Sequence, residues 1–132
     1  LFEGRYVRYT EAKPMSLDKC RELIVDTIGV LSSIYRYGQV AYIGGGFAVS
    51  IHNTLEAAVY GMPVVFGPTW KKFREAHGLL NAGAAITVRN YREFANALDT
   101  AFATQHVMGQ AATDYVNSEL GATNKILKHL NL

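Results

Sequence analysis

Short apolar runs alternate with longer segments of helical character along most of the chain. Five runs rich in β-branched, aromatic and other apolar residues predict strands at residues 6–9, 23–25, 40–43, 63–66 and 85–88. Apolar residues at helical spacing, often ended by glycine, predict helices at residues 30–37, 52–60, 70–81, 91–105, 108–120 and 124–130. The pattern contains no internal repeat, so one alternating α/β arrangement accounts for most of the chain.

The predicted strands are apolar throughout, without a polar residue at every second position. Such strands are buried on both faces, which is typical of parallel sheets covered by helices. The intervening helices provide the crossovers that parallel strands need. We therefore expect one α/β domain over residues 1–132, a Rossmann-like open parallel sheet of about five strands with helices on both faces. Such sheets bind ligands outside the carboxyl ends of their strands, which directs attention to the segments after Ile43 and Phe66 and to residues 27–29.

Composition narrows the classes of partner. The 132 residues suit one compact domain, and a hydrophobic content of 49% is enough for a core. The formal net charge of +2 does not indicate nucleic-acid binding, for which a clustered basic face is expected. The single cysteine, Cys20, cannot form an internal disulfide and fits a reducing compartment. No apolar run approaches the ~18 residues of a membrane-spanning helix.

Three consecutive glycines, Gly44, Gly45 and Gly46, followed by Phe47, come directly after a predicted strand. Glycine lets the backbone turn sharply and lets a ligand approach the amides, so a tight strand exit and a ligand contact are both compatible with this run. The dinucleotide pattern G-x-G-x-x-G fails because Val49 stands at its third glycine. The phosphate-loop motif of ATP-binding proteins is absent, so neither a standard NAD site nor a standard ATP site is supported.

The next predicted helix carries His52, Asn53 and Glu56 at its start. Asn followed three residues later by Glu is the spacing of a capping box, which alone would explain both residues. The same geometry also suits a nucleotide, because a carboxylate can accept two hydrogen bonds from a ribose diol and a helix start can meet a phosphate. His52 could donate a hydrogen bond to a phosphate, or it could simply cap the helix or pack against its neighbours. The sequence leaves these alternatives open.

No spacing of Cys, His or carboxylates indicates a metal site, and no Ser-His-Asp or Cys-His arrangement suggests nucleophilic catalysis. We therefore expect no metal and no cofactor within this stretch.

Several motifs in order resemble the C-terminal domain of the bacterial 3-deoxy-manno-octulosonic acid (Kdo) transferases, in a variant similar to those of the Bacteroides group. They are D-T-I-G at 26–29, G-G-G-F at 44–47, H-N-T-L-E at 52–56, G-M-P-V-V-F-G-P at 61–68 and K-K-F-R-E-A at 71–76. The resemblance covers residues 22–98. Ala48 and Ser50 depart from it, since the family often has glycine there.

The resemblance implies the donor-binding half of a B-type (GT-B) glycosyltransferase, which holds CMP-Kdo for inverting transfer to the lipid A precursor in lipopolysaccharide biosynthesis. It places the acceptor site and the general base in a partner N-terminal domain, so we expect no catalytic residue in this stretch and expect this stretch alone to be inactive. It also implies a cytoplasmic enzyme peripheral to the inner membrane, with membrane association through the full-length protein. The nucleotide-sugar site it implies comprises Gly29, Gly44, Gly45, Gly46, Phe47, His52, Asn53 and Glu56, with Gly67, Pro68 and Lys71 at the edge of the cleft.

Two other functions remain compatible with the sequence. One is the donor domain of another B-type glycosyltransferase that uses a UDP-sugar, because nothing in the sequence resolves how the base is recognised. The other is a non-catalytic Rossmann-like nucleotide-binding module, because a fold alone does not fix a function. Selective binding of CMP over UMP and AMP would separate the Kdo transferase from these two.

Overall fold

The computed structural model describes residues 6–14 and 20–130. Internal contacts divide the chain into two compact units, Leu1–Ile34 and Tyr35–Leu132. Each unit is described by itself.

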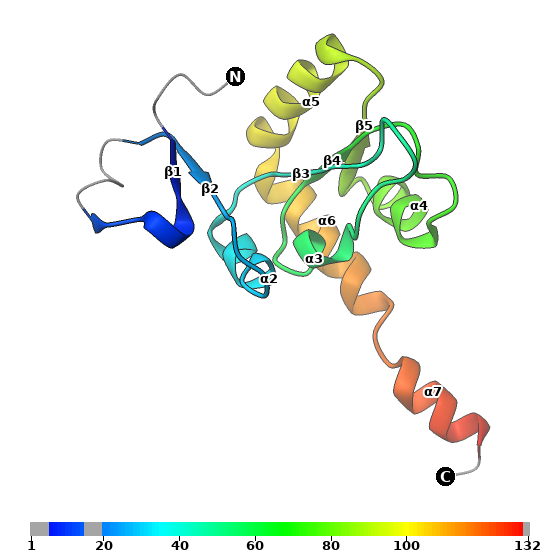
Figure 1. The fold of residues 1–132 in the computed structure, drawn as a ribbon. Helices are drawn as coiled ribbons and strands as arrows, with labels where there is room; N and C mark the ends of the chain where they lie inside the picture. Colours follow the sequence, from blue (N-terminus) through cyan, green and yellow to red (C-terminus); the bar gives the residue numbers. More distant parts are fainter. Residues whose placement is uncertain (1–5, 15–19, 131–132) are drawn as a thin grey trace. The chain divides into compact units, whose positions relative to one another are not determined.

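The first unit contains a small parallel sheet (Figure 1). Strand β1 (Tyr6–Arg8) pairs in parallel with β2 (Glu22–Ile24). A 3₁₀ turn (Tyr9–Glu11) follows β1, and a single helical turn, α2 (Leu31–Ile34), closes the unit. Both strands were predicted to within a residue at each end.

The second unit is built on a three-stranded parallel sheet in the order β3-β4-β5. Its strands are β3 (Ala41–Ile43), β4 (Val64–Phe66) and β5 (Ala85–Thr87). The register pairs Ala41 with Val64 and Val64 with Ala85. All three residues of β4 are fully buried, as expected for the central strand of a parallel sheet.

Helices cover both faces of this sheet (Figure 1). Alternate residues of β4 separate two cores, since Val64 and Phe66 join one cluster and Val65 joins the other. Helices α3 (Leu55–Ala58), α4 (Arg74–Asn81) and α6 (Gln105–Ser118) supply the first cluster, and α5 (Tyr91–Ala103), with Met108 of α6, supplies the second. A last helix, α7, runs from Ala122 to His129. The predicted α/β class with parallel strands and helices on both faces is confirmed.

The structure differs from the sequence prediction in three respects. The five strands of the described residues fall into two sheets, where we expected one, because β3 pairs only with β4 in the described part of the chain. The helix expected at 52–60 begins only at Leu55, and residues 51–53 are irregular. The helix expected at 70–81 begins at Arg74, because Phe73 is extended and its N–H closes a turn onto the carbonyl of Trp70 at 2.9 Å.

Candidate functional site

Two loops meet at the carboxyl ends of β3 and β4. The first spans residues 44–54 and the second spans residues 67–73. The Thr69 N–H donates to the carbonyl of Gly46 at 2.9 Å, and the Ile51 N–H donates to the carbonyl of Thr69 at 3.3 Å. These two bonds join the loops where a parallel sheet ordinarily receives its ligand.

The glycines of the first loop have different structural roles. Gly45 has φ +87°, and a Cβ there would collide with the carbonyl of Ser50. Gly46 lies in backbone contact with Gly67, since a Cβ on Gly46 would stand 2.8 Å from the Gly67 Cα. Gly44 differs, because a Cβ there would meet only the His52 ring at 3.8 Å. Turning and close packing therefore account for Gly45 and Gly46, whereas neither accounts for Gly44.

His52 lies against the glycine loop. Its backbone N–H donates to the carbonyl of Gly44 at 3.1 Å, so the two ends of the loop are joined. Its ring lies close enough to Gly45 that a Cβ there would be 3.3 Å from Nε2. The side chain is exposed, so a ligand lying over Gly44 would also reach the imidazole.

Asn53 and Glu56 are held together, but not as a complete capping box. The Asn53 carbonyl oxygen Oδ1 accepts from the Leu55 N–H at 3.0 Å, and its amide Nδ2 donates to Glu56 Oε1 at 3.1 Å. A full box would direct the carboxylate to the backbone N–H of the capping residue. The other oxygen of Glu56 has no hydrogen-bond partner among the described residues. Burial of Tyr35 raises the pKa of its hydroxyl, and the charge of Glu56 raises it further.

A basic hollow of about 260 Å³ lies between the two loops. Val49 and Ser50 line it from the first loop, and residues 68–69 and 71–73 line it from the second. Lys71 and Lys72 stand in a turn ahead of α4 and are exposed. The Lys71 carbonyl lies 2.9 Å from the His77 ring nitrogen Nε2, which fixes the backbone of this turn. Two lysines beside an open hollow can attract an anion.

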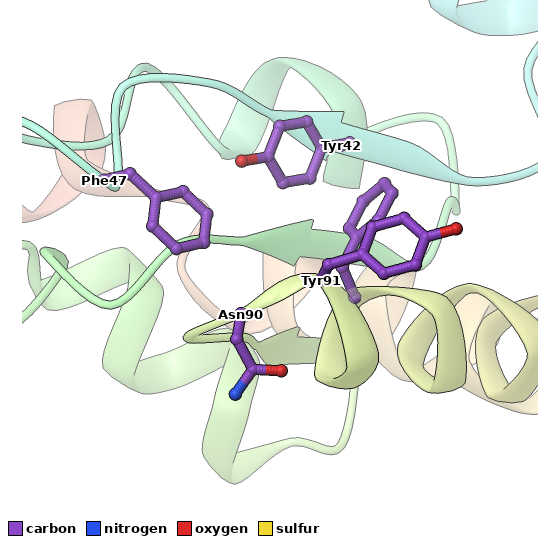
Figure 2. A pocket seen from close by; sticks show the side chains of 5 residues that line it. Tyr42, Phe47, Asn90 and Tyr91 are labelled. Carbon is purple, nitrogen blue, oxygen red and sulfur yellow. The ribbon is translucent and has the colours of Figure 1, made fainter.

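A second hollow, of about 290 Å³, is aromatic. Figure 2 shows Tyr42, Phe47 and Tyr91 around it, and Asn90 and Phe94 complete the lining. The Tyr42 and Phe94 rings meet edge to face, with their centroids 5.1 Å apart. Of these residues, Phe47 alone was expected in a site. The other four join Phe47 through tertiary contacts that no local motif reveals.

Gly29 belongs to the first unit, unlike the other expected site residues, which all belong to the second. It has φ +90°, and a Cβ there would meet nothing within 4 Å. Nearby in the sequence, Asp26 accepts hydrogen bonds from the Thr10 hydroxyl at 2.8 Å and from the Thr10 N–H at 3.2 Å. These bonds, with a smaller contribution from Arg8, hold the pKa of Asp26 below its ordinary value. These bonds tie the loop after β2, which contains Asp26 and Gly29, to the 3₁₀ turn after β1.

Sequence reasoning also missed Thr54. Its side chain is fully buried, and its hydroxyl makes no hydrogen bond within the described part of the chain.

No group of three or more His, Cys, Asp or Glu among the residues described could hold a metal ion. No described helix is long and apolar enough to cross a bilayer.

Comparisons with known proteins agree with the motifs. No protein-family model matches the chain. The 3-deoxy-D-manno-octulosonic acid transferase of Rickettsia prowazekii is 36% identical over 76 residues, 57% of this chain and 16% of that protein. The enzyme of the same name from Aquifex aeolicus is 35% identical over 78 residues, 58% of this chain and 22% of that protein. The one from Bordetella pertussis is 34% identical over 116 residues, 82% of this chain and 26% of that protein.

This chain is homologous to part of the 3-deoxy-D-manno-octulosonic acid transferases. The alignments span only 16% to 26% of the length of these three relatives. A bifunctional glycosyltransferase/methyltransferase of Fusobacterium nucleatum is a further relative, 31% identical over 98 residues, 72% of this chain and 15% of that protein. The expected similarity to a Bacteroides-group variant has no support among these relatives.

The fold has a solved counterpart. The structure of the C-terminal CMP-Kdo binding domain of WaaA from Acinetobacter baumannii matches with a TM-score of 0.71, over 88% of this chain and 61% of that chain. The sequence identity is 18%, so this match bears on the fold. It agrees with the predicted C-terminal half of a B-type glycosyltransferase.

Proposed function

We propose that this chain is the donor-binding part of a Kdo transferase and that it holds CMP-Kdo where the loops after β3 and β4 meet. One observation carries the proposal. The motifs that resemble those of the Kdo transferases converge, within the second unit, on the joined loops at the carboxyl end of a parallel sheet. The glycine loop, the Asn53–Glu56 pair and the lysine hollow all belong to these loops or to the turn that follows them.

Glu56 is suited to the ribose of the donor. Asn53 fixes one carboxylate oxygen, and the other has no partner among the described residues. A carboxylate held in this way can accept hydrogen bonds from the two hydroxyls of a ribose, which are charge-assisted and stronger than neutral ones. Because Asn53 also caps the turn at Leu55, the carboxylate is oriented before the ligand arrives.

In this proposal side chains, and not a helix dipole, bind the phosphate of CMP. Helix α3 has four residues, Leu55–Ala58, so its dipole is small, and we assign the phosphate to side chains in its place. Lys71 lines the basic hollow, and His52 lies over Gly44 and Gly45. These groups would stabilise the negative charge that develops on CMP as it departs. Pro68 also lines this hollow, and Gly67 lies against Gly46 of the glycine loop.

The remaining steps of the reaction belong to the whole protein. In this proposal Kdo passes from CMP to a sugar hydroxyl of the lipid A precursor with inversion at the transferred carbon. The general base and the acceptor site lie in an N-terminal domain outside residues 1–132, and so does the contact with the cytoplasmic face of the inner membrane. This stretch alone would bind donor without transferring sugar.

A binding experiment on matched variants tests the donor site. We expect Glu56→Gln to weaken CMP binding about tenfold or more, since a hydrogen bond to a charged group is worth roughly 1.5–3 kcal/mol. We expect Lys71→Ala to weaken binding of CMP but to leave binding of cytidine unchanged, because cytidine lacks the phosphate. Isothermal titration of the full-length enzyme measures both.

Lys128 provides the matched control. It is an exposed lysine in the last turn of α7, and Lys128→Ala should leave the affinity for CMP within a factor of two. An equal loss of affinity in Lys71→Ala and Lys128→Ala would show that Lys71 acts only through the net charge of the protein and does not contact the phosphate. A preference for UMP would favour the UDP-sugar enzyme instead, and equal affinity for CMP, UMP and AMP would favour the nucleotide-binding module.

A further inference from the structure

The turn that contains Lys71 and Lys72 has few backbone contacts of its own. Thr69, just before the turn, is bonded to the first loop through both its N–H and its carbonyl. Within the described part of the chain, the backbone of the two lysines makes one hydrogen bond, in which the Lys71 carbonyl accepts from the ring of His77 at 2.9 Å. His77 is therefore the residue that fixes the backbone of the two lysines.

The ring of His77 is held by two contacts. Its Nε2 carries the proton of the hydrogen bond, because a carbonyl oxygen only accepts. The ring also meets that of Trp70 edge to face, with centroids 4.7 Å apart and planes at 71°. Trp70 in turn packs against the first cluster, next to Phe66. The two contacts restrict rotation of the imidazole, so its N–H stays directed at the lysine turn.

Helix α4, which carries His77, is anchored in the second unit. Its Ala76 and Leu79 are fully buried in the first cluster. Its Gly78 lies against the Tyr115 ring of α6, since a Cβ on Gly78 would collide with that ring. Because the helix is fixed, its histidine holds the lysine turn at a constant position relative to the sheet.

Lys71 is available to an anion, unlike the arginine that follows the turn. Arg74 forms an ion pair with Glu119 of the segment after α6, with 2.9 Å between Nη2 and Oε2. Among the described residues, neither Lys71 nor Lys72 has an ion-pair partner. A lysine ammonium beside an open hollow can therefore take a phosphate without breaking an existing pair.

We propose that His77 is a positioning residue of the phosphate site, which keeps Lys71 beside the basic hollow by holding its carbonyl. The inference rests on the function proposed above, in which Lys71 binds the phosphate of CMP. His77 lines neither the basic nor the aromatic hollow, so it acts through Lys71 and not on the ligand. Binding orders a long lysine side chain at a cost in entropy, and a backbone fixed beforehand lowers that cost.

Binding of CMP and of cytidine to variants of the full-length enzyme tests the inference. His77→Phe keeps a ring against Trp70 but removes the donor. We expect it to weaken CMP binding about three- to tenfold, the equivalent of one hydrogen bond. Cytidine binding should be unchanged, because cytidine has no phosphate. His77→Gln, which restores an N–H donor, should bind CMP within about a factor of two of the wild type.

A double variant shows whether His77 acts through Lys71. In the Lys71→Ala background, His77→Phe should weaken CMP binding no further, because the lysine that it positions is gone. Additive losses would overturn the inference, and so would equal losses for CMP and cytidine. His106→Phe is the matched control, since His106 is an exposed histidine on α6, and it should leave CMP binding unchanged.

The outcomes separate this inference from the function on which it rests. If Lys71→Ala weakens CMP binding and His77→Phe does not, the inference alone is wrong. If Lys71→Ala leaves CMP binding unchanged, the phosphate contact of the proposed function is wrong, and the inference fails with it. Denaturation midpoints of all variants show whether a loss of binding is a loss of folding.

Nitrogen NMR of the histidine rings in the wild-type full-length enzyme needs no ligand. Correlation of the ring nitrogens with the carbon-bound ring protons identifies which nitrogen of a neutral histidine carries the proton, and the signals lost in His77→Gln belong to His77. We expect the proton on Nε2, because that nitrogen donates to the Lys71 carbonyl. A neutral His77 with its proton on Nδ1 would leave the carbonyl without its donor and overturn the inference.

Discussion

Replacing Gly46 by alanine should disrupt the contact between the two loops of the site. A Cβ on Gly46 would stand 2.8 Å from both the Cα and the N of Gly67, and 2.9 Å from the Ile51 Cγ2. Carbon atoms in favourable contact lie about 3.5–4.0 Å apart, so the loops would have to separate by roughly 0.7 Å. The hydrogen bond from the Thr69 N–H to the Gly46 carbonyl, at 2.9 Å, resists that movement.

The magnitude follows from two opposing effects. Overpacking of this kind costs about 1–3 kcal/mol. Alanine in place of glycine recovers about 0.4–1 kcal/mol by restricting the unfolded chain. We therefore expect Gly46→Ala to lower the free energy of unfolding by roughly 1–2 kcal/mol. Gly44→Ala should leave it unchanged or raise it slightly, since its Cβ would make only an ordinary contact with His52 at 3.8 Å.

Chemical denaturation followed by tryptophan fluorescence measures the difference. Trp70 is the single tryptophan of the chain. It packs beside β4, with its ring centroid 6.3 Å from that of Phe66, so its emission reports on this end of the sheet. If Gly46→Ala proves as stable as Gly44→Ala, the close approach of Gly46 and Gly67 is wrong. The pair also separates two roles, because Gly44→Ala should weaken nucleotide binding without loss of stability.

Two further predictions concern polar side chains away from the glycine loop. Thr10→Val removes the 2.8 Å hydrogen bond to Asp26 but keeps the backbone one, so the pKa of Asp26 should rise toward its ordinary value of 3.8, as carboxyl NMR shifts would show. Because the pKa of Asp26 is lowered in the folded state, its stabilising contribution is present above its ordinary pKa and is lost as the pH falls through the folded pKa. A pKa of Asp26 at or above 3.8 in the wild-type protein would contradict the hydrogen bond. Thr54→Val should stabilise the fold by about 1 kcal/mol in thermal denaturation, because it removes a buried hydroxyl without a described partner; a clear loss of stability would show that the hydroxyl is bonded after all.

Much of the fold could be predicted from local pattern. The central strand was found because Val64, Val65 and Phe66 are apolar without interruption, and strands buried on both faces have that pattern. Helix starts were less accurate. The turn from Trp70 to Phe73 is set by packing of both aromatic rings against the core, and no residue in the segment indicates a break. The division into two sheets depends on pairing between distant strands, which local sequence does not record.

The site was predictable where its residues are neighbours in the sequence. Asn53 and Glu56 are three apart, so the spacing indicated that they would interact, although the bond that forms joins their side chains and is not the one of a capping box. The contact between Gly46 and Gly67 joins two separate loops. The sequence indicated that the backbone can turn sharply at the glycines, but it did not reveal that these two approach each other closely. The aromatic hollow was missed for the same reason, since it brings together Tyr42 of β3 and Phe94 of α5, which are far apart in the sequence.

The central claim is that the joined loops after β3 and β4 hold the donor nucleotide, and an amide NMR titration with CMP tests it most directly. UMP and AMP serve as controls. The account predicts CMP-selective shifts at residues 44–47 and 53–56, with an affinity as weak as the millimolar range, about 4 kcal/mol, in the isolated chain. Shifts that are equal for all three nucleotides, or that leave these residues unmoved in the full-length enzyme, would contradict it.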